Sequence, residues 1–188
     1  MSFLRTLIMI RFDEKGYGQI WNIIHTLETR PKKILELGCG HGILVEMLLG
    51  DGYDAYGLDK DGGFLVERAV EENRLVKGDA QHIQNHFKDQ FDGVVSNSLL
   101  SVMGLNSSAG PGGVGWVDIT SLIEEDEMPD VSQDAENIHK STYNALISGG
   151  FAIHKTPDME KIIAPSELFN DKYKIIKKDY NLLVLQKI

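Results

Sequence analysis

The chain has 188 residues, of which 42% are hydrophobic and 25% are charged, and its formal net charge is −9. These values are typical of a soluble globular domain that is large enough to bury its own core. The negative charge disfavours a large nucleic-acid footprint and binding to an anionic membrane surface. A single cysteine excludes a disulfide framework.

The apolar residues 1–12 do not have the features of a signal peptide. Arg5 and Arg11 flank a very short apolar core, and an acidic stretch follows without a small-residue cleavage site. No apolar run is long enough to cross a bilayer. We therefore expect a cytoplasmic protein with no membrane partner, in which residues 1–30 form an N-terminal cap segment.

Two periodic patterns open the chain. Residues 17–29 predict an amphipathic helix that ends before Pro31, with one apolar face formed by Ile20, Trp21, Ile24 and Leu27. A strand is expected at residues 33–37, directly after this helix. It ends in a turn that carries three glycines at alternate positions, Gly38, Gly40 and Gly42.

This glycine turn leads into a helix expected over residues 41–49. Glycine adopts positive φ and lets the backbone approach a ligand closely, and the first N–H groups of the helix point at that ligand. Strand, glycine turn and helix in this order are typical of a nucleotide-binding α/β domain. Ile43 stands where a dinucleotide-binding fingerprint has its third glycine.

Strands and helices then alternate along the chain. Further strands are expected at residues 54–58, 74–77, 91–96 and 151–154, and helices at about 63–73, 80–87 and 131–147, the last closed by Gly149 and Gly150. Residues 172–177 and 181–187 predict two strands joined by a very short turn, hence an antiparallel pair. The whole pattern predicts an α/β, doubly wound, mostly parallel sheet with an antiparallel C-terminal hairpin.

Residues 104–130 interrupt this alternation. They contain five glycines, two prolines and the acidic run 124–127, together with apolar residues such as Trp116. The segment is too long for an ordinary connection, so we expect a functional insertion or a mobile segment. One hypothesis is a lid that folds over an acceptor, and the alternative is a disordered insertion without a role.

Acidic residues follow two of the expected strands, where ligands bind in open α/β sheets. Asp59 ends the second strand, and its carboxylate can accept hydrogen bonds from ribose hydroxyls. Asp79 follows the third strand and can accept from the exocyclic amine of adenine, while the N–H of Ala80 meets a ring nitrogen. A helix cap is the alternative role for each carboxylate.

Four motifs in this order resemble those of class I S-adenosylmethionine-dependent methyltransferases. They are ILELGCGHG at residues 34–42, YGLD at 56–59, KGDA at 77–80 and FDGVVS at 91–96. The resemblance covers about residues 17–100 well and continues more loosely through 144–154 and the C-terminal hairpin. It implies a seven-stranded, three-layer Rossmann-like fold, a single methyltransferase domain over residues 1–188, and S-adenosyl-L-methionine as cofactor.

The resemblance also implies where the cofactor binds. It lies over residues 38–42, with Glu36 near its methionine end, Asp59 at the ribose, Asp79 at the adenine, and Ser96 and Asn97 beside the methyl donor. The implied cofactor-binding residues are Glu36, Gly38, Cys39, Gly40, Gly42, Asp59, Lys60, Asp79, Ala80, Ser96 and Asn97. Cys39 suits the crowded turn because it is small, and a reactive thiol is the alternative.

The acceptor and the catalytic group are less defined. Residues 96–99 read Ser-Asn-Ser-Leu, so the Asn/Asp-Pro-Pro-aromatic motif of family members that act on nucleobase or amide nitrogens is missing. We expect a small-molecule acceptor and no nucleic acid. His154 is a catalytic candidate at the end of the expected fifth strand. His139 and Tyr143, one turn apart on a helix, are weaker catalytic candidates, because a structural surface role is favoured for both.

The same residues bear on a possible metal site and on two other functions. His82 and His86 share a helix face, but without a third ligand we expect a solvated face and no metal site. A nicotinamide oxidoreductase is disfavoured by Ile43 and by the motif at Asp79. A non-catalytic cofactor-binding or partner-docking protein of the same fold remains open, with the acidic run 124–127 as its docking surface.

Overall fold

The computed structural model describes residues 17–62, 73–97, 131–155, 172–179 and 181–188. The helices are α2 (Tyr17–Thr26), α3 (Ile43–Gly50), the 3-10 helix η1 (Ala80–His82), α5 (Ile83–His86) and α7 (Val131–Ala145). The strands are β1 (Lys33–Leu37), β2 (Asp54–Asp59), β3 (Leu75–Lys77), β4 (Phe91–Asn97), β5 (Leu146–Lys155), β6 (Tyr173–Asp179) and β7 (Leu182–Lys187). The expectations for residues 1–16, 63–72 and 104–130 lie outside the described residues.

The strands form one seven-stranded sheet in the order β3-β2-β1-β4-β5-β7-β6. The first five strands in the chain are parallel, whereas β7 is antiparallel to both β5 and β6. The predicted doubly wound sheet and its antiparallel hairpin are therefore confirmed. The chain reverses its direction of winding between β1 and β4, and this switch point is where open α/β sheets bind ligands.

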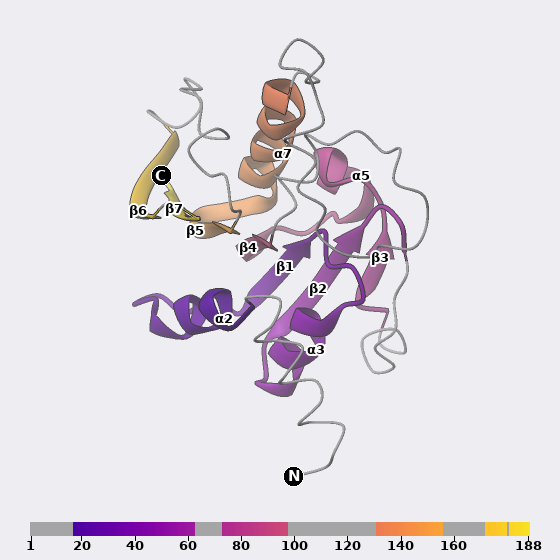
Figure 1. Ribbon diagram of the computed structural model, residues 1–188, viewed down its shortest axis with the longest axis horizontal. Coiled ribbons are helices and arrows are strands. Elements are labelled where there is room, and N and C mark those ends of the chain that lie inside the picture. The colour runs from indigo at the N-terminus through magenta and orange to yellow at the C-terminus, as the bar shows by residue number, and fades with distance from the viewer. Residues whose placement is uncertain (1–16, 63–72, 98–130, 156–171, 180) are drawn as a thin grey trace, which may run out of the picture.

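Helices cover both faces of the sheet, as Figure 1 shows. On one face, α2 and α3 pack through residues such as Ile24 and Leu44 against Ile34 of β1 and Val95 of β4. On the other face, α5 and α7 contribute Ile83 and Ile138 to a second buried cluster. Strands covered on both faces must be apolar on both, which explains the near-continuous apolar runs. No described helix is long and apolar enough to span a membrane.

The predicted boundary between α7 and β5 is wrong. The helix was expected to continue to residue 147 and to be closed by two glycines, but it ends at Ala145 and β5 begins at Leu146. The pairing with β4 starts at Leu146, shifts register, and resumes at Phe151. Gly149, with φ of 78°, lies in this irregularity. The glycine pair thus marks a bulge in a strand, a position that glycine also favours.

Two other helix bounds differ from the prediction. The helix α3 begins at Ile43 and not at residue 41, because Gly42 is its N-cap and has a left-handed φ of 83°. The helix α2 ends at Thr26 and not at residue 29. There the Thr26 hydroxyl donates to the carbonyl of Ile23 at 3.1 Å, a local side-chain bond of the kind found where helices end.

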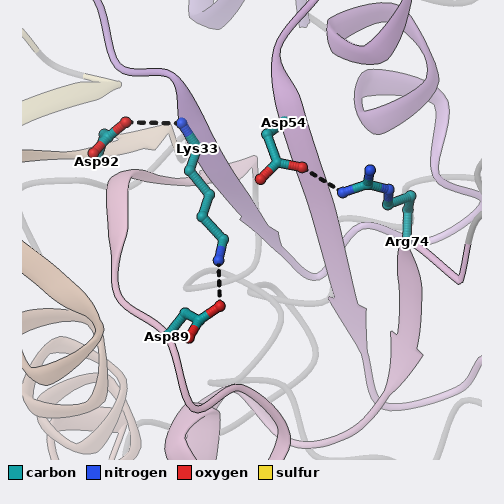
Figure 2. Close-up of polar contacts among 5 residues, drawn as sticks. All are labelled: Lys33, Asp54, Arg74, Asp89 and Asp92. Carbon is teal, nitrogen blue, oxygen red and sulfur yellow. Dashed lines mark hydrogen bonds and ion pairs between the residues drawn. The ribbon is translucent and has the colours of Figure 1, made fainter.

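Charged side chains tie together the amino ends of the parallel strands, as Figure 2 shows. The ammonium of Lys33 in β1 lies 2.9 Å from the Asp89 carboxylate, and Arg74 pairs with Asp54 at the start of β2. Asp92 of β4 accepts hydrogen bonds from the backbone N–H groups of Lys32 and Lys33, at 2.7 and 2.8 Å. These contacts fix β1 against its neighbours.

Candidate cofactor site at the carboxyl edge of the sheet

The glycine turn lies at the carboxyl end of β1, between β2 and β4. Its three alternate glycines all have positive φ, 66° at Gly38, 51° at Gly40 and 83° at Gly42, a conformation that costs other residues strain. The Gly38 N–H donates to the carbonyl of Leu58 in β2 at 2.8 Å, which holds the turn on the sheet. A Cβ at Gly40 would meet no atom of the described residues within 4 Å, so these residues leave space open at Gly40.

The start of α3 faces the same edge. Gly42 caps this helix without a side-chain hydrogen bond. Free N–H groups and the helix dipole at such an end favour a negatively charged group, such as the carboxylate of an amino acid. The turn and the helix start together therefore provide a backbone surface suited to the methionine part of the cofactor.

Asp59 lies beside the glycine turn, at the end of the neighbouring strand β2. Its Oδ2 accepts from the Gly40 N–H at 2.8 Å, and its Oδ1 accepts from the Asp61 N–H at 2.9 Å. The first bond joins two segments 19 residues apart, so the carboxylate does more than cap a local turn. Each carboxylate oxygen has two acceptor sites, and Asp59 can still accept from a ribose. Lys60, which follows it, is exposed.

Asp79 is the N-cap of the helix η1, which is the alternative role expected for it from the sequence. Its Oδ1 accepts from the Gln81 N–H at 2.9 Å at the start of η1. The described residues use only this oxygen, so Oδ2 can accept a further hydrogen bond. Ala80 follows and is 7% exposed. A cap and an adenine-binding role are therefore compatible in this carboxylate.

Tyr17 joins the site from the first turn of α2, and the sequence interpretation missed it. The Asn97 side chain hydrogen-bonds to the phenol of Tyr17. Burial raises the pKa of Tyr17 far above its usual value, and the negative charges of Glu36 and Asp59 raise it further. Tyr17 lies three residues before Ile20, one helical turn earlier on the same apolar face. This spacing is the sequence signal that could have identified it.

Glu36 is buried beneath the turn, with 1% of its surface exposed. Its charge raises the pKa of both Tyr17 in α2 and Cys39 in the turn, so its carboxylate lies near both. A buried carboxylate favours a positively charged ligand group nearby. The ammonium or the sulfonium of S-adenosylmethionine has this charge, so Glu36 fits the role that the resemblance implies.

Cys39 is a packing residue. Its side chain is fully buried, and a Cβ at Gly57 of β2 would lie only 2.6 Å from its sulfur. Burial, with Glu36 and Asp59 nearby, raises the pKa of the thiol, so it stays protonated and unreactive at neutral pH. The expectation of a small residue in a crowded turn agrees with this environment.

Ser96, for which a place beside the methyl donor is expected, contacts a side chain of the neighbouring strand. It is 1% exposed, and its hydroxyl lies 2.8 Å from Nδ1 of His154 in the adjacent strand β5. His139 of α7 packs edge-on against the His154 ring, with 5.0 Å between the ring centroids. Ser96, His154 and His139 thus form one buried polar cluster between the sheet and α7.

Both histidine rings in this cluster are neutral at physiological pH. Burial lowers the pKa of His139 to about 4. Burial and the neighbouring His139 lower the pKa of His154 well below its usual value. His139 is 3% exposed, so the surface role expected for it is wrong. Tyr143, one turn later, lies apart from the cluster and packs against Tyr173 of β6.

No group of three potential metal ligands occurs within the described parts of the chain. His82 and His86 are exposed, and the His86 ring packs against the backbone of Gly78, where a Cβ would lie 2.3 Å from Nε2. His41, in the glycine turn, is exposed.

Comparison with known proteins agrees with this geometry. Residues 35–108 match the family model of the methyltransferase domain. No sequence among the curated proteins matches the chain. The fold is similar to that of PH0226 from Pyrococcus horikoshii, with a TM-score of 0.59 and 13% identity over 94% of this chain and 91% of that one.

Two further solved structures have the same fold. A TehB-like S-adenosylmethionine-dependent methyltransferase from Corynebacterium glutamicum gives a TM-score of 0.51 and 18% identity, over 93% of this chain and 97% of that one. TrmN from Thermus thermophilus gives a TM-score of 0.54 and 15% identity over 84% of this chain. The chain spans 44% of the length of TrmN. Residues 35–108 are thus similar to a methyltransferase domain, and the fold is the one that these solved structures share.

Proposed function

We propose that this chain transfers the methyl group of S-adenosylmethionine to a small-molecule acceptor. The observation that carries the proposal is the bond from the Gly40 N–H to the Asp59 carboxylate. It sets an open glycine turn beside an acidic residue at the switch point of the sheet. Backbone N–H groups and a hydroxyl-binding carboxylate at that place suit an amino acid joined to a nucleoside.

Each part of the site has a role in this proposal. The turn at residues 38–42 and the start of α3 bind the methionine carboxylate, and Glu36 stabilises the positive charge. Asp59 accepts from the ribose hydroxyls, with Lys60 at the rim, and Asp79 and Ala80 bind the adenine. Asn97, held by Tyr17, lies beside the reacting centre at the end of β4. Ser96, the preceding residue, has a supporting role through its hydrogen bond to His154.

Bound S-adenosylmethionine supplies a methyl group on a sulfonium, which is already a good leaving group. The chain must therefore hold the acceptor atom, the methyl carbon and the sulfur in line and keep water away, and this positioning can supply much of the acceleration. A general base is required only for an acceptor that must lose a proton early. The enclosed, neutral rings of His139 and His154 favour a structural role in this arrangement.

The preference for a small molecule is supported by charge and by sequence. The net charge of −9 opposes binding to a polyanion, and residues 96–99 lack the motif associated with nucleobase nitrogens. We place the domain over residues 1–188 and expect it to act in the cytoplasm.

Ligand binding tests the first half of the proposal. S-adenosylmethionine or S-adenosylhomocysteine should raise the thermal midpoint, with a stabilisation of about 2.7 kcal/mol at a ligand concentration near 100 times the dissociation constant. NADH at the same concentration should give no shift. Absence of a shift with millimolar S-adenosylmethionine would contradict the cofactor assignment.

Turnover tests the second half. The protein, supplied with S-adenosylmethionine and the low-molecular-weight fraction of a cell extract, should form S-adenosylhomocysteine, and the macromolecular fraction should not replace it. Asp79→Ala should reduce this turnover, whereas Asp92→Ala at the opposite edge is the matched control. Cofactor binding without turnover in either fraction would favour a non-catalytic binding protein.

A further inference from the structure

The outermost strand β6 has an unusual exposure. It lies at one end of the sheet and pairs only with β7, as Figure 1 shows in yellow beside the C-terminus. Six of its seven residues are exposed, and only Tyr173 is buried. Its outer edge pairs with no described strand. As far as the described residues show, a row of backbone N–H and C=O groups is available there for another strand.

Apolar side chains gather at this edge. Ile175 is 51% exposed and Ile176 is 42% exposed. Ile188 is 68% exposed, and its N–H donates to the carbonyl of Lys172 at 3.0 Å, which places it beside the start of β6. Three of the four large hydrophobic residues that are exposed in the described chain therefore lie in or beside β6. Such a concentration marks an interaction surface.

The same strand is positively charged in a chain that is negative overall. Three lysines lie in β6, Lys174, Lys177 and Lys178, and Lys172 directly precedes it. Lys177 pairs with Asp179 at 3.0 Å. Lys174 and Lys178 form no ion pair with any described residue. They are exposed, so their charges are available to a partner.

We propose that β6 binds an extended acidic peptide segment of a partner protein, which adds to the sheet as a further strand. Backbone pairing supplies affinity, the lysines select acidic side chains, and the isoleucines bind apolar ones. A second copy of this chain is disfavoured because antiparallel pairing of two β6 strands sets lysines against lysines, and like charges across strands repel. A nucleic acid would neutralise the lysines but leave the backbone edge and the isoleucines unused.

A labelled synthetic peptide of alternating glutamate and valine tests the proposal by fluorescence anisotropy. It should bind the full-length protein, and more weakly as salt is added. Lys174→Glu combined with Lys178→Glu should weaken binding about tenfold or more, since both contacts change from attraction to repulsion. Lys88→Glu is the matched control, because Lys88 is exposed but lies before β4. It should bind the peptide as the wild type does.

Backbone pairing is tested with the same peptide N-methylated at alternate residues, which cannot form the ladder and should lose binding. The double variant should keep its thermal shift with S-adenosylmethionine, which shows that it is folded. Equal binding of the N-methylated peptide, of a threonine–valine peptide or of single-stranded RNA would overturn the proposal. Unchanged binding by the double variant would also overturn the proposal. If the wild type does not bind the peptide at all, the proposal is wrong and the lysines only shield the edge from aggregation.

Discussion

The two ends of the strands β1 to β4 differ in how their polar groups are satisfied. At the amino ends, opposite charges pair directly, as Lys33 does with Asp89 and Arg74 with Asp54. At the carboxyl ends, Asp59 and Asp79 accept from backbone N–H groups and form no ion pair with a described basic side chain. Their remaining lone pairs can therefore bind a ligand.

The backbone differs in the same way. The amino ends are rigidly held, with Asp92 accepting from two successive N–H groups and with the cations of Lys33 and Arg74 stacked over the Tyr56 ring. The carboxyl end of β1 leads instead into glycines at positive φ, and the described residues leave space open at Gly40. One edge thus stabilises the sheet, and the other keeps binding groups available. Substitutions at the two edges should separate stability from binding.

The largest effect is expected on binding, at the carboxyl edge. Asp59→Ala and Asp79→Ala should each weaken binding of S-adenosylhomocysteine by about 1.5–3 kcal/mol, roughly ten- to a hundredfold, because each loses charge-assisted hydrogen bonds. Isothermal titration calorimetry measures the affinity, and urea unfolding checks that the chain still folds. Wild-type affinity in both variants would mean that these carboxylates are only caps.

Acid sensitivity should come from the histidine cluster near the carboxyl end of β5. Folding lowers the pKa of His139 from 6.5 to about 4, so the unfolded chain takes up the proton more readily. The stability that the neutral ring contributes is present above pH 6.5 and is lost as the pH falls towards 4. For His139 alone the free energy of unfolding should drop by about 2 kcal/mol between about pH 7 and about pH 5.

The variant His139→Phe should lose the part of this acid sensitivity that His139 contributes, measured by urea unfolding at the two pH values, while the part due to His154 remains. It keeps an aromatic ring against His154, so packing changes little. His82→Gln is the matched control because His82 is exposed, and its pH dependence should equal that of the wild type. An unchanged pH dependence in the His139 variant would show that the neutral ring does not contribute to acid lability.

At the amino edge, Asp92→Ala should affect stability alone. The carboxylate accepts from the N–H groups of Lys32 and Lys33, and its loss should lower the free energy of unfolding by about 1–2 kcal/mol. The dissociation constant for S-adenosylhomocysteine should not change. Weakened ligand binding at full stability would contradict the division between the two edges.

The smallest effect is expected at Lys33. Its ammonium pairs with Asp89, whose side chain is 80% exposed, so the pair is screened by solvent. Lys33→Met, which keeps the aliphatic stem over the Tyr56 and Phe91 rings, should lower stability by less than about 1 kcal/mol. The difference from the wild type should shrink in high salt. A larger, salt-independent loss would indicate a packing role.

Local patterns in the sequence predicted most of the fold. The strand at Lys33–Leu37 is found with the predicted bounds, since a short apolar run followed by glycines has one favourable structure. The acids at the ends of β2 and β3 lie at the carboxyl edge because parallel strands end there. The end of α7 was misplaced because a glycine pair serves equally at a helix end and in a strand bulge.

The sequence by itself determined the alternating strands, the glycine turn and the two acids, because each depends on residues adjacent in the chain. Only the tertiary structure decided the contacts between distant segments. Tyr17 reaches Asn97 because α2 packs over β1 and β4. Ser96 and His154, 58 residues apart, meet because β4 pairs with β5 in one particular register. Periodicity within an element does not specify that register, since it is set by how whole elements pack together.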